Sequence, residues 1–477
     1  MTERCALAGA LSAALLWLGG CANPIPAYQR PAPPVAAAFA NEPQPSAGAA
    51  LADAIDWQRY FADERLKRLI GIALEDNRDL RVAMLSIEQA RALYQIRRAD
   101  ELPTVSLAAS GLRQPGAGGG MTSLYSVGAA VTAYELDFFG RVKSLSESAL
   151  AQFFATEEAR KTVQISLVAG VANAYLGLLA DDELLRVTEQ TLATRQQSLD
   201  LTRLKFDNGV VSELDVRQAE SLLEAARVIR AQLTRQRALD QNALVLLLGR
   251  PLPADLPTGL DLNAHQVTAE LLAGVPAEVL TRRPDVRQAE QQLIAANANI
   301  GAARAAFFPR ITLTGSAGIA SSDLTELFKG GSFAWTLAPQ LVLPIFDSGR
   351  NQSNLDAAAV SRDIAVAQYE KTLQTAFREV ADSLAGRASL GEQLRAQTAQ
   401  AAAEQARVRL ADLRYGNGAA SYLELLDAQR SLFVAQQAVI QLQAQQTQNL
   451  VTLYKVLGGG WSAAGERTAR AQGATAR

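Results

Sequence analysis

Residues 414–430 have the sequence RYGNGAASYLELLDAQR, and residues 205–221, 209 positions earlier, have the sequence KFDNGVVSELDVRQAES. Both stretches place an aromatic residue before Asn-Gly and a serine before a new apolar run. Asn-Gly after a helical pattern predicts a helix end, because glycine accepts the left-handed backbone conformation found there. A serine followed three residues later by Asp or Glu predicts the cap of a second helix. Each stretch is therefore predicted to be the tip of a hairpin of two antiparallel helices.

The similarity between the two tips extends along the chain. Arg81 and Pro103 recur 206 positions later as Arg287 and Pro309, and LPTVSLAASG matches FPRITLTGSAG. Matches that keep the same order over about 200 residues indicate an internal duplication. Chance convergence of two helix turns is therefore not needed to explain the shared tips.

Each repeat is predicted to contain three long helices and two strands. The first helix spans residues 63–99 in one repeat and 285–306 in the other, and a proline that cannot extend it follows. The second helix begins near Arg141 or Arg350 and continues to Asn-Gly, over about 65 residues or about 100 Å at 1.5 Å per residue. The third helix returns from the tip over about 35 residues.

The returning helices carry apolar residues at alternating spacings of three and four, which predicts a coiled coil. In the second repeat these residues are Leu425, Ala428, Leu432, Ala435, Val439 and Leu442. In the first repeat the corresponding positions are Val216, Ala219, Leu223, Ala226, Arg230 and Leu233. Arg230 interrupts this apolar seam. Its side chain could face a neighbouring chain or water, and the pattern does not decide between them.

Four runs of alternating residues predict strands, at residues 105–110, 125–133, 311–319 and 333–343. Their length and their apolar and polar faces match the strands of membrane-spanning barrels. The inner-facing positions are small and polar: Ser106, Ser110, Thr312 and Ser316. The edge of a soluble β-sandwich would alternate in the same way. The glycine run at 116–120 predicts a hairpin loop rather than a phosphate site, since no helix follows it.

A four-stranded sheet in lipid would leave two open edges whose backbone groups find no water to bond. Four strands cannot close a barrel, because barrels of this kind begin at about eight. Several chains must therefore share one barrel. Two chains would give eight strands and little lumen, whereas three would give twelve strands and an open channel.

The composition excludes several classes of function. The chain has 477 residues and a net charge of −2, which gives no reason to expect a nucleic-acid partner. One histidine, His265, and two cysteines are too few for a histidine-ligated or Cys2His2 metal site. No Ser/His/Asp arrangement or pair of carboxylates stands out, so the sequence predicts neither an enzyme nor a cofactor. The role of His265 is left open.

The N-terminus predicts export from the cytoplasm. An apolar run from Ala6 to Leu18 follows Arg4 and is typical of a signal peptide. It ends in Leu-Gly-Gly-Cys, which resembles the bacterial lipobox, so Cys21 is predicted to carry a covalent lipid. The alternative is an ordinary signal peptide cut near Ala22. Residues 24–45 are rich in Pro and Ala. This segment is predicted to be an extended tether with no fold of its own.

Four stretches carry a resemblance to a known family. They are WQRYFADERLKRLIGIALEDNRDLRVA, RRPDVRQAEQQLIAANANIGAARAAFFPRITLTGSAG, YLELLDAQRSLFVAQQ and LYKVLGGGW. In these stretches the chain resembles the TolC/OprM outer-membrane factors, the exit ducts of tripartite efflux pumps, and especially the lipoprotein OprM branch. The resemblance covers nearly all of the mature chain.

The resemblance implies a mainly α fold with a membrane β-barrel. Long coiled-coil helices would form an α-barrel, and three chains would share a 12-stranded β-barrel. The implied organisation is a signal peptide at 1–20, a lipidated tether and equatorial segment at 21–60, repeats at 61–250 and 281–457, an equatorial linker at 251–280 and an equatorial tail at 458–477.

The resemblance also implies a gate at the periplasmic end, which in this chain falls on Arg414, Leu423 and Asp427. Three copies of Asp427 around an axis would form a carboxylate ring that attracts cations. Ion pairs at such an exposed place are worth about 0 to 1 kcal/mol each, so the gate could open when a partner binds. The alternative, that Arg414 and Asp427 are ordinary solvated charges of a coiled coil, stays open. The first repeat has Lys205, Leu214 and Gln218 at the equivalent positions.

The implied partners are two further copies of the chain, a periplasmic adaptor protein, an inner-membrane RND-type transporter and outer-membrane lipid. The expected adaptor contacts are the tip residues Asn208, Gly209, Val210, Asn417 and Gly418. The predicted function is passive conduction of small molecules from the periplasm to the exterior. A periplasmic scaffold without a channel and a duct for secreted proteins are the alternatives. The sequence names neither the exported molecules nor the pump.

Overall fold

The computed structural model describes residues 24–39, 50–52, 55–115, 119–264, 266–268, 271–272 and 280–461. Cys21, the signal peptide and His265 lie outside the described residues. The chain divides into two compact units. In the described chain the first contains residues 24–32, 85–115, 119–158 and 287–372. The second contains residues 33–39, 50–52, 55–84, 159–264, 266–268, 271–272, 280–286 and 373–461.

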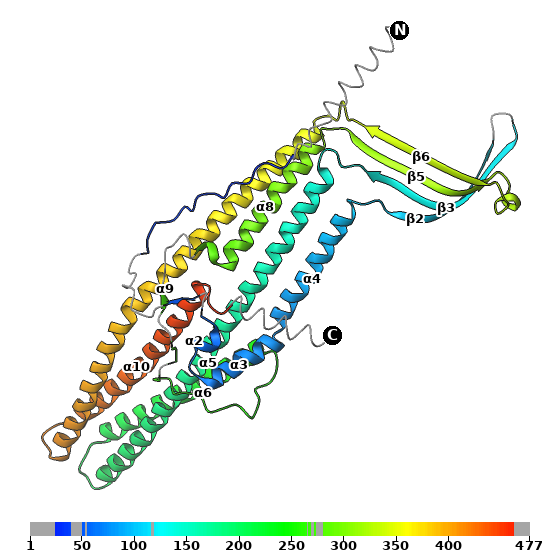
Figure 1. Cartoon of the computed structure of the whole chain (residues 1–477). Coiled ribbons are helices and arrows are strands. Elements are labelled where there is room, and N and C mark those ends of the chain that lie inside the picture. Colours follow the sequence, from blue (N-terminus) through cyan, green and yellow to red (C-terminus); the bar gives the residue numbers. More distant parts are fainter. Residues whose placement is uncertain are drawn as a thin grey trace. The chain divides into compact units, whose positions relative to one another are not determined.

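The first unit contains a four-stranded antiparallel sheet with the order β2-β3-β5-β6 (Figure 1). Its strands are β2 (Val105–Pro115), β3 (Met121–Glu135), β5 (Arg310–Ser321) and β6 (Phe333–Val342). The sequence prediction of four strands is confirmed, and the pairing of β3 with β5 joins the two repeats. Within the described chain β2 and β6 are the outer strands of this sheet, so each has one unpaired edge.

The two faces of the sheet differ as the alternation predicts. On one face hydroxyls pair across strands, with Ser110 2.8 Å from Ser126 and Ser316 2.8 Å from Thr336. The other face carries large exposed apolar side chains, including Leu107 (84% exposed). Exposed apolar surface on this scale is what lipid contact requires.

Two glycines bring β3 and β5 unusually close. Gly128 lies opposite Gly318 in the pairing register. A Cβ on Gly128 would lie 2.4 Å from the Ala317 carbonyl oxygen, and a Cβ on Gly318 would lie 2.2 Å from that of Val127. No side chain fits at either position, so both glycines are required by backbone approach.

The first predicted helix is interrupted, which corrects the expectation of one helix over residues 63–99. The structure has α3 (Glu64–Asp76) and α4 (Arg78–Ala99), with Asn77 between them at ψ 131°. The Asn77 side chain accepts a hydrogen bond from the Leu80 N–H at 2.9 Å and donates one to the Leu247 carbonyl at 2.9 Å. An Asn side chain that caps a new helix in this way competes with helix continuation. The counterpart in the second repeat, α8 (Pro284–Ala305), is a single helix.

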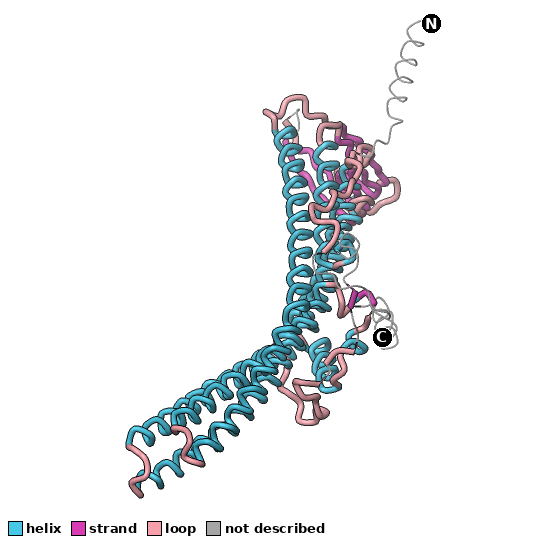
Figure 2. The backbone as a smooth tube through the Cα atoms, turned by 90° about the vertical axis from the view of Figure 1, so that its left-hand side faces the viewer, coloured by secondary structure: helices cyan, strands magenta, loops and turns pink. Residues whose placement is uncertain are grey.

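The longest helices match their predicted limits. The helices α5 (Arg141–Asp207) and α9 (Arg350–Gly416) have 67 residues each. Each turns at its tip into a returning helix, α6 (Glu213–Leu248) or α10 (Tyr422–Val456), as Figure 2 shows. The first four seam residues of α6, Val216, Ala219, Leu223 and Ala226, are buried, whereas Arg230 is exposed.

The core of the second unit surrounds α2 (Trp57–Tyr60). The ring of Tyr60 stacks on Tyr454 with centroids 4.0 Å apart. Gly459, after α10, lets the chain pack closely on this core, because a Cβ there would lie 2.2 Å from the Tyr454 ring. A short parallel pair, β1 (Ala50–Leu51) with β4 (Leu271–Leu272), belongs to the same unit. One 18-residue window of α5 is apolar enough in composition to cross a membrane, but half of it is buried in the protein.

Asp63 ties the linker after α6 to this core. It is fully buried, and its carboxylate accepts hydrogen bonds from the Arg65 N–H at 2.7 Å, where it caps α3. It also accepts from the Tyr175 hydroxyl and from the Leu260 N–H, both at 2.8 Å. These three hydrogen bonds compensate the Asp63 carboxylate for the water that it loses on burial.

The segment at 24–39 has no regular secondary structure, as expected for a tether. It differs from a free tether because residues 24–30 bind to α8 through several side chains. The prolines that exclude helix and strand leave an extended chain, which can still bind to a neighbouring helix.

Candidate functional site at the hairpin tips

The two hairpin tips have the same backbone structure. The Val210 N–H donates to the Lys205 carbonyl at 2.9 Å, and the Ala419 N–H donates to the Arg414 carbonyl at 2.8 Å. Gly209 has φ 72° and Gly418 has φ 69°. This is the left-handed helix end that Asn-Gly predicts in both repeats. The five expected adaptor contacts, Asn208, Gly209, Val210, Asn417 and Gly418, are all exposed.

The caps that follow the tips differ. Ser212 and Asp215 form a complete capping box, in which each side chain accepts a hydrogen bond from the other residue's backbone N–H. In the second repeat Ser421 accepts from the Glu424 N–H at 3.4 Å, but the Glu424 carboxylate pairs with Arg414 at 2.9 Å. Arg414 also donates to the Ala419 carbonyl at 3.2 Å. Within the described chain Arg414 therefore stabilises its own tip.

The two hairpins pack against each other through a shared apolar cluster. Its buried members come from both repeats: Leu199, Val216, Ala219, Leu223, Ala411, Tyr422, Leu425, Leu426 and Ala428. Two polar contacts cross the same interface. The hydroxyls of Ser198 and Tyr422 are 2.8 Å apart, and the Lys205 ammonium lies 3.1 Å from the Tyr415 hydroxyl.

Lys205 and Arg414 occupy equivalent positions but have different partners. The Lys205 ammonium lies 4.4 Å from the centre of the Tyr415 ring, a cation–π distance, and so joins the first tip to the second. Arg414 instead pairs inside the second tip. This difference was not predicted, because it depends on which helices become neighbours after folding.

A groove of about 380 Å³ lies between α6 and α10 just above the tips. Its lining combines four residues of the second repeat, Leu423, Leu426, Asp427 and Arg430, with four of the first, Arg217, Gln218, Ser221 and Leu222. The structure thus brings together two of the three predicted gate residues, and it places Gln218, the uncharged counterpart of Asp427, beside them. Arg414 and Leu214 do not line this groove.

Asp427 has two arginine partners that sequence reasoning missed. Its Oδ2 lies 2.5 Å from Nη2 of Arg407 on α9, and its Oδ1 lies 2.5 Å from Nη2 of Arg430. The hydrogen bond from Arg407 and the charges of both arginines hold the pKa of the Asp427 carboxyl below its usual value. The Arg430 partner could have been found from its spacing of three on one helix. Arg407 could not, since it lies on the opposite arm of the hairpin.

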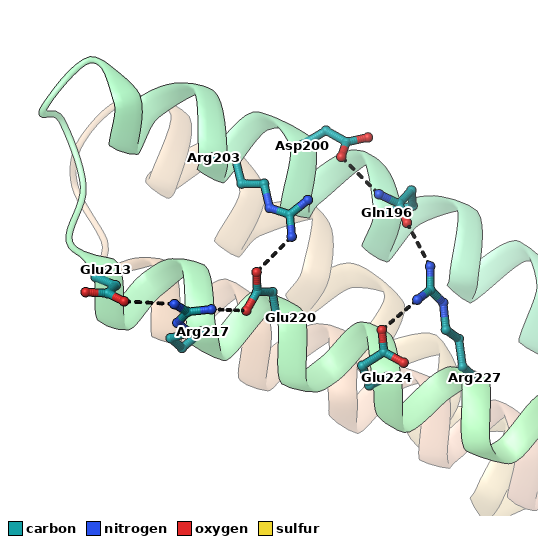
Figure 3. Close-up of polar contacts among 8 residues, drawn as sticks. All are labelled: Gln196, Asp200, Arg203, Glu213, Arg217, Glu220, Glu224 and Arg227. Atoms are coloured by element: carbon teal, nitrogen blue, oxygen red, sulfur yellow. Dashed lines mark hydrogen bonds and ion pairs between the residues drawn. The ribbon is translucent and has the colours of Figure 1, made fainter.

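The first hairpin carries a ladder of exposed polar contacts in place of this cluster (Figure 3). Arg203 on α5 reaches Glu220 on α6 at 2.8 Å, and Arg217 lies 2.9 Å from both Glu213 and Glu220. Farther from the tip along α6, Arg227 contacts Glu224 at 2.6 Å. Exposed pairs of this kind contribute little to stability, because water and salt screen their charges. Of these ion pairs, Arg203–Glu220 joins α5 to α6, whereas those of Arg217 and Arg227 lie within α6.

A buried arginine lies above the tips. Arg195 on α5 is 5% exposed, and its Nη1 donates to the Leu222 carbonyl on α6 at 2.6 Å. Its guanidinium lies 5.2 Å from the centre of the Phe433 ring on α10. Burial lowers the pKa of this guanidinium. One cation thus connects three helices, and movement of α10 away from α5 would expose it to water.

The chemistry available at the tips is that of a polar opening and not of catalysis. The Ser212 hydroxyl donates to the Asp215 carboxylate at 2.7 Å, but this contact belongs to the cap of α6. Among the residues that the structure describes, no group of three or more His, Cys, Asp or Glu side chains is arranged to hold a metal ion.

Comparison with known proteins gives consistent results. The profile of the family described as "Outer membrane efflux protein" matches residues 69–250 and 275–459. The chain is 50% identical over 455 residues, 93% of each chain, to a toluene efflux pump outer membrane protein, TtgC, and to an antibiotic efflux pump outer membrane protein, ArpC, both from Pseudomonas putida. Its fold is similar to the open state of the MtrE outer membrane channel of Neisseria gonorrhoeae. The TM-score is 0.85, with 43% identity over 91% of this chain and 98% of that one.

Proposed function

The chain belongs to the outer membrane efflux protein family and is the outer-membrane channel of a tripartite efflux pump, and on this premise we propose that the tip of its second hairpin closes the periplasmic end of the duct. It is a passive channel and not an enzyme. The functional unit is a trimer that works with an adaptor and an inner-membrane RND pump. These coarse predictions from the sequence are confirmed, whereas the gate residues remain a proposal.

One observation supports the gate most strongly: Leu423 and Asp427 line one groove with residues of the other repeat. Asp427 carries the only carboxylate in that lining. Three copies would place three carboxylates around the pore axis, each beside Arg407 and Arg430 of its own chain. Arg217 and Arg430 line the same groove, so each carboxylate would lie among paired charges at the constriction.

The contacts that would hold the gate shut are individually weak. Asp427 is 39% exposed in its side chain, and its partners Arg407 and Arg430 are more exposed still. The contacts of Ser198 with Tyr422 and of Lys205 with Tyr415 join the two hairpins by one polar pair each. An adaptor that bound more tightly to separated hairpins would shift the population to the open state. The exposed tip residues, among which Val210 is 70% exposed, are the proposed docking surface.

We infer that the exported molecules are small and largely apolar. The relatives named for toluene and for antibiotic efflux support this inference. Lipidation of Cys21 belongs to the same proposal, because Cys21 lies outside the described residues. Mass spectrometry of the N-terminal peptide would detect the added acyl chains.

Cross-linking of the two hairpins tests the gate. Cysteines replace Ser198 and Tyr422, and a bifunctional thiol reagent joins them in cells that depend on this channel for toluene tolerance. We expect export to stop when the reagent bridges the hairpins and to continue with a monofunctional reagent. A control pair that joins α5 to α6 within the first hairpin, at Arg203 and Glu220, should leave export intact. Normal export through fully bridged hairpins would contradict the proposal.

A further inference from the structure

The N-terminal strap, residues 24–30, lies against one face of α8. The Pro24 carbonyl accepts a hydrogen bond from Arg304 at 3.3 Å, and the Pro26 carbonyl accepts one from the Asn297 amide at 2.8 Å. Arg30 reaches Glu290, further toward the start of α8. Residue numbers thus rise along the strap as they fall along α8, so the two segments run antiparallel.

Two glycines make room for this strap. A Cβ on Gly301 would lie 2.6 Å from Cγ1 of Ile25, and a Cβ on Gly140 would lie 2.8 Å from the Pro24 ring. Contacts this short do not occur with real Cβ atoms. Gly301 also approaches Ser144 of α5. The strap therefore lies directly on the backbone of α8 and of the turn before α5.

Arg30 neutralises a buried carboxylate. Glu290 is 8% exposed, and Arg30 binds both of its oxygens, at 2.7 Å and 3.0 Å. The Tyr28 hydroxyl donates to the same carboxylate at 3.1 Å. Burial and the Glu290 charge together raise the pKa of the fully buried Tyr369 hydroxyl. Without Arg30, the Glu290 carboxylate would remain buried with no cation among these contacts, which is strongly unfavourable.

The duplicated helix α4 cannot bind a strap in this way. At the repeat spacing of 206, the positions of Glu290, Asn297, Gly301 and Arg304 are occupied by Met84, Arg91, Gln95 and Arg98. The carboxylate, the amide donor and the space for Ile25 are all missing there. The binding stripe is thus a property of the second repeat alone, with one site in each chain.

We propose that Glu290, Asn297, Gly301 and Arg304 form a docking stripe for the chain's own N-terminus, with the Arg30–Glu290 pair as its specific determinant. The stripe holds Pro24 beside Gly140, where the chain passes from β3 into α5. Cys21 is three residues before Pro24, a reach of at most about 11 Å. If Cys21 carries a lipid, as the proposed function includes, the stripe determines where that lipid enters the membrane.

Spin labelling of the full-length chain tests the docking stripe. A nitroxide on Ala27→Cys, an exposed strap position, reports the mobility of the strap. In the otherwise unchanged chain we expect slow motion. Arg30→Glu places two carboxylates together and should give a fast spectrum, and Glu290→Gln should increase the mobile fraction. The double variant Arg30→Glu, Glu290→Arg should restore slow motion. Gln29→Ala, which changes an exposed neighbour that makes no side-chain hydrogen bond to the described residues, should have no effect.

The outcomes separate docking from loss of fold and from lipidation. Trimers of each variant are first verified by size-exclusion chromatography. If the charge-reversal variants do not form trimers, Glu290→Gln still tests the proposal, because it keeps the shape of the side chain. A slow spectrum in both Arg30→Glu and Glu290→Gln would overturn the proposal. A Cys21→Ser chain exported by the signal peptide of a soluble periplasmic protein should also keep the slow spectrum. Fast motion there would show that the lipid, and not the stripe, holds the strap.

Discussion

The pair Asp181 and Asp240 gives the chain a predicted dependence on pH. Asp181 on α5 is 6% exposed, and its Oδ2 has no hydrogen-bond donor among the described residues. Asp240 on α6 is its nearest partner and accepts from Gln236 at 3.0 Å. Two facing carboxyls need a shared proton. Burial, followed by the hydrogen bond and charge of Asp240, raises the pKa of Asp181 from 3.8 to about 7.

The sign and size of the effect follow from this shift. A carboxyl whose pKa is higher in the folded state is most favourable for folding when both states are protonated, below about pH 4. As the pH rises from about 4 to about 7, the free energy of unfolding falls by roughly 4 kcal/mol per chain, at 1.36 kcal/mol per pKa unit. Asp240 is partly exposed, so solvent screening reduces the estimate to about 2–4 kcal/mol. The neighbouring charges, Asp182 and Arg237, pair with each other.

The assay is the thermal unfolding midpoint of the purified protein between pH 5 and pH 8. The original chain should lose stability across this range. Asp181→Asn should remove most of the loss, because an amide can donate to Asp240 without titrating. Glu189→Gln, which changes an exposed carboxylate on α5 that does not act on Asp181, should keep the original slope. If Asp181→Asn kept that slope too, or if the original chain became more stable toward pH 8, the reasoning about the shared proton would be wrong.

Two further predictions concern the sheet and the caps. Gly128→Ala should abolish heat-resistant trimers on native gels, since its Cβ would lie 2.4 Å from a backbone oxygen. Gly315→Ala should keep them, since its Cβ would lie 3.4 Å from the Thr336 carbonyl oxygen. Trimers that survive Gly128→Ala would refute the close-approach argument. Ser212→Ala should cost about 1 kcal/mol at the start of α6, or about fivefold faster amide exchange there. Ser421→Ala should cost less because Glu424 is already paired with Arg414; equal effects would argue against the difference between the caps.

Local patterns in the sequence predicted the main elements of the fold. The ends of α5 and α9 follow from Gly-Arg at one end and Asn-Gly at the other, and the strands follow from strict alternation. The duplication added the correspondence between the repeats. The break at Asn77 could not be predicted, because its side chain bonds to Leu247, 170 positions away. The docking of the N-terminal strap depends on Glu290, which is even more distant from Arg30.

Local spacing in the sequence also predicted part of the candidate site. Leu423 and Asp427 lie one turn apart on α10, and both line the groove. The contact of Asp427 with Arg407 and the contact of Lys205 with the Tyr415 ring depend on how the helices pack. Such contacts join residues that are far apart in the sequence, and no local spacing encodes them.

The central claim is that Asp427 on the second tip closes the duct, and single-channel conductance in planar bilayers tests it most directly. Asp427 and Gln218 occupy equivalent positions in the two repeats and line the same groove, so they form a matched pair. We predict that trimers with Asp427→Ala conduct several-fold more than the original channel, whereas Gln218→Ala leaves conductance unchanged. Equal conductance in the original channel and both variants would contradict the claim.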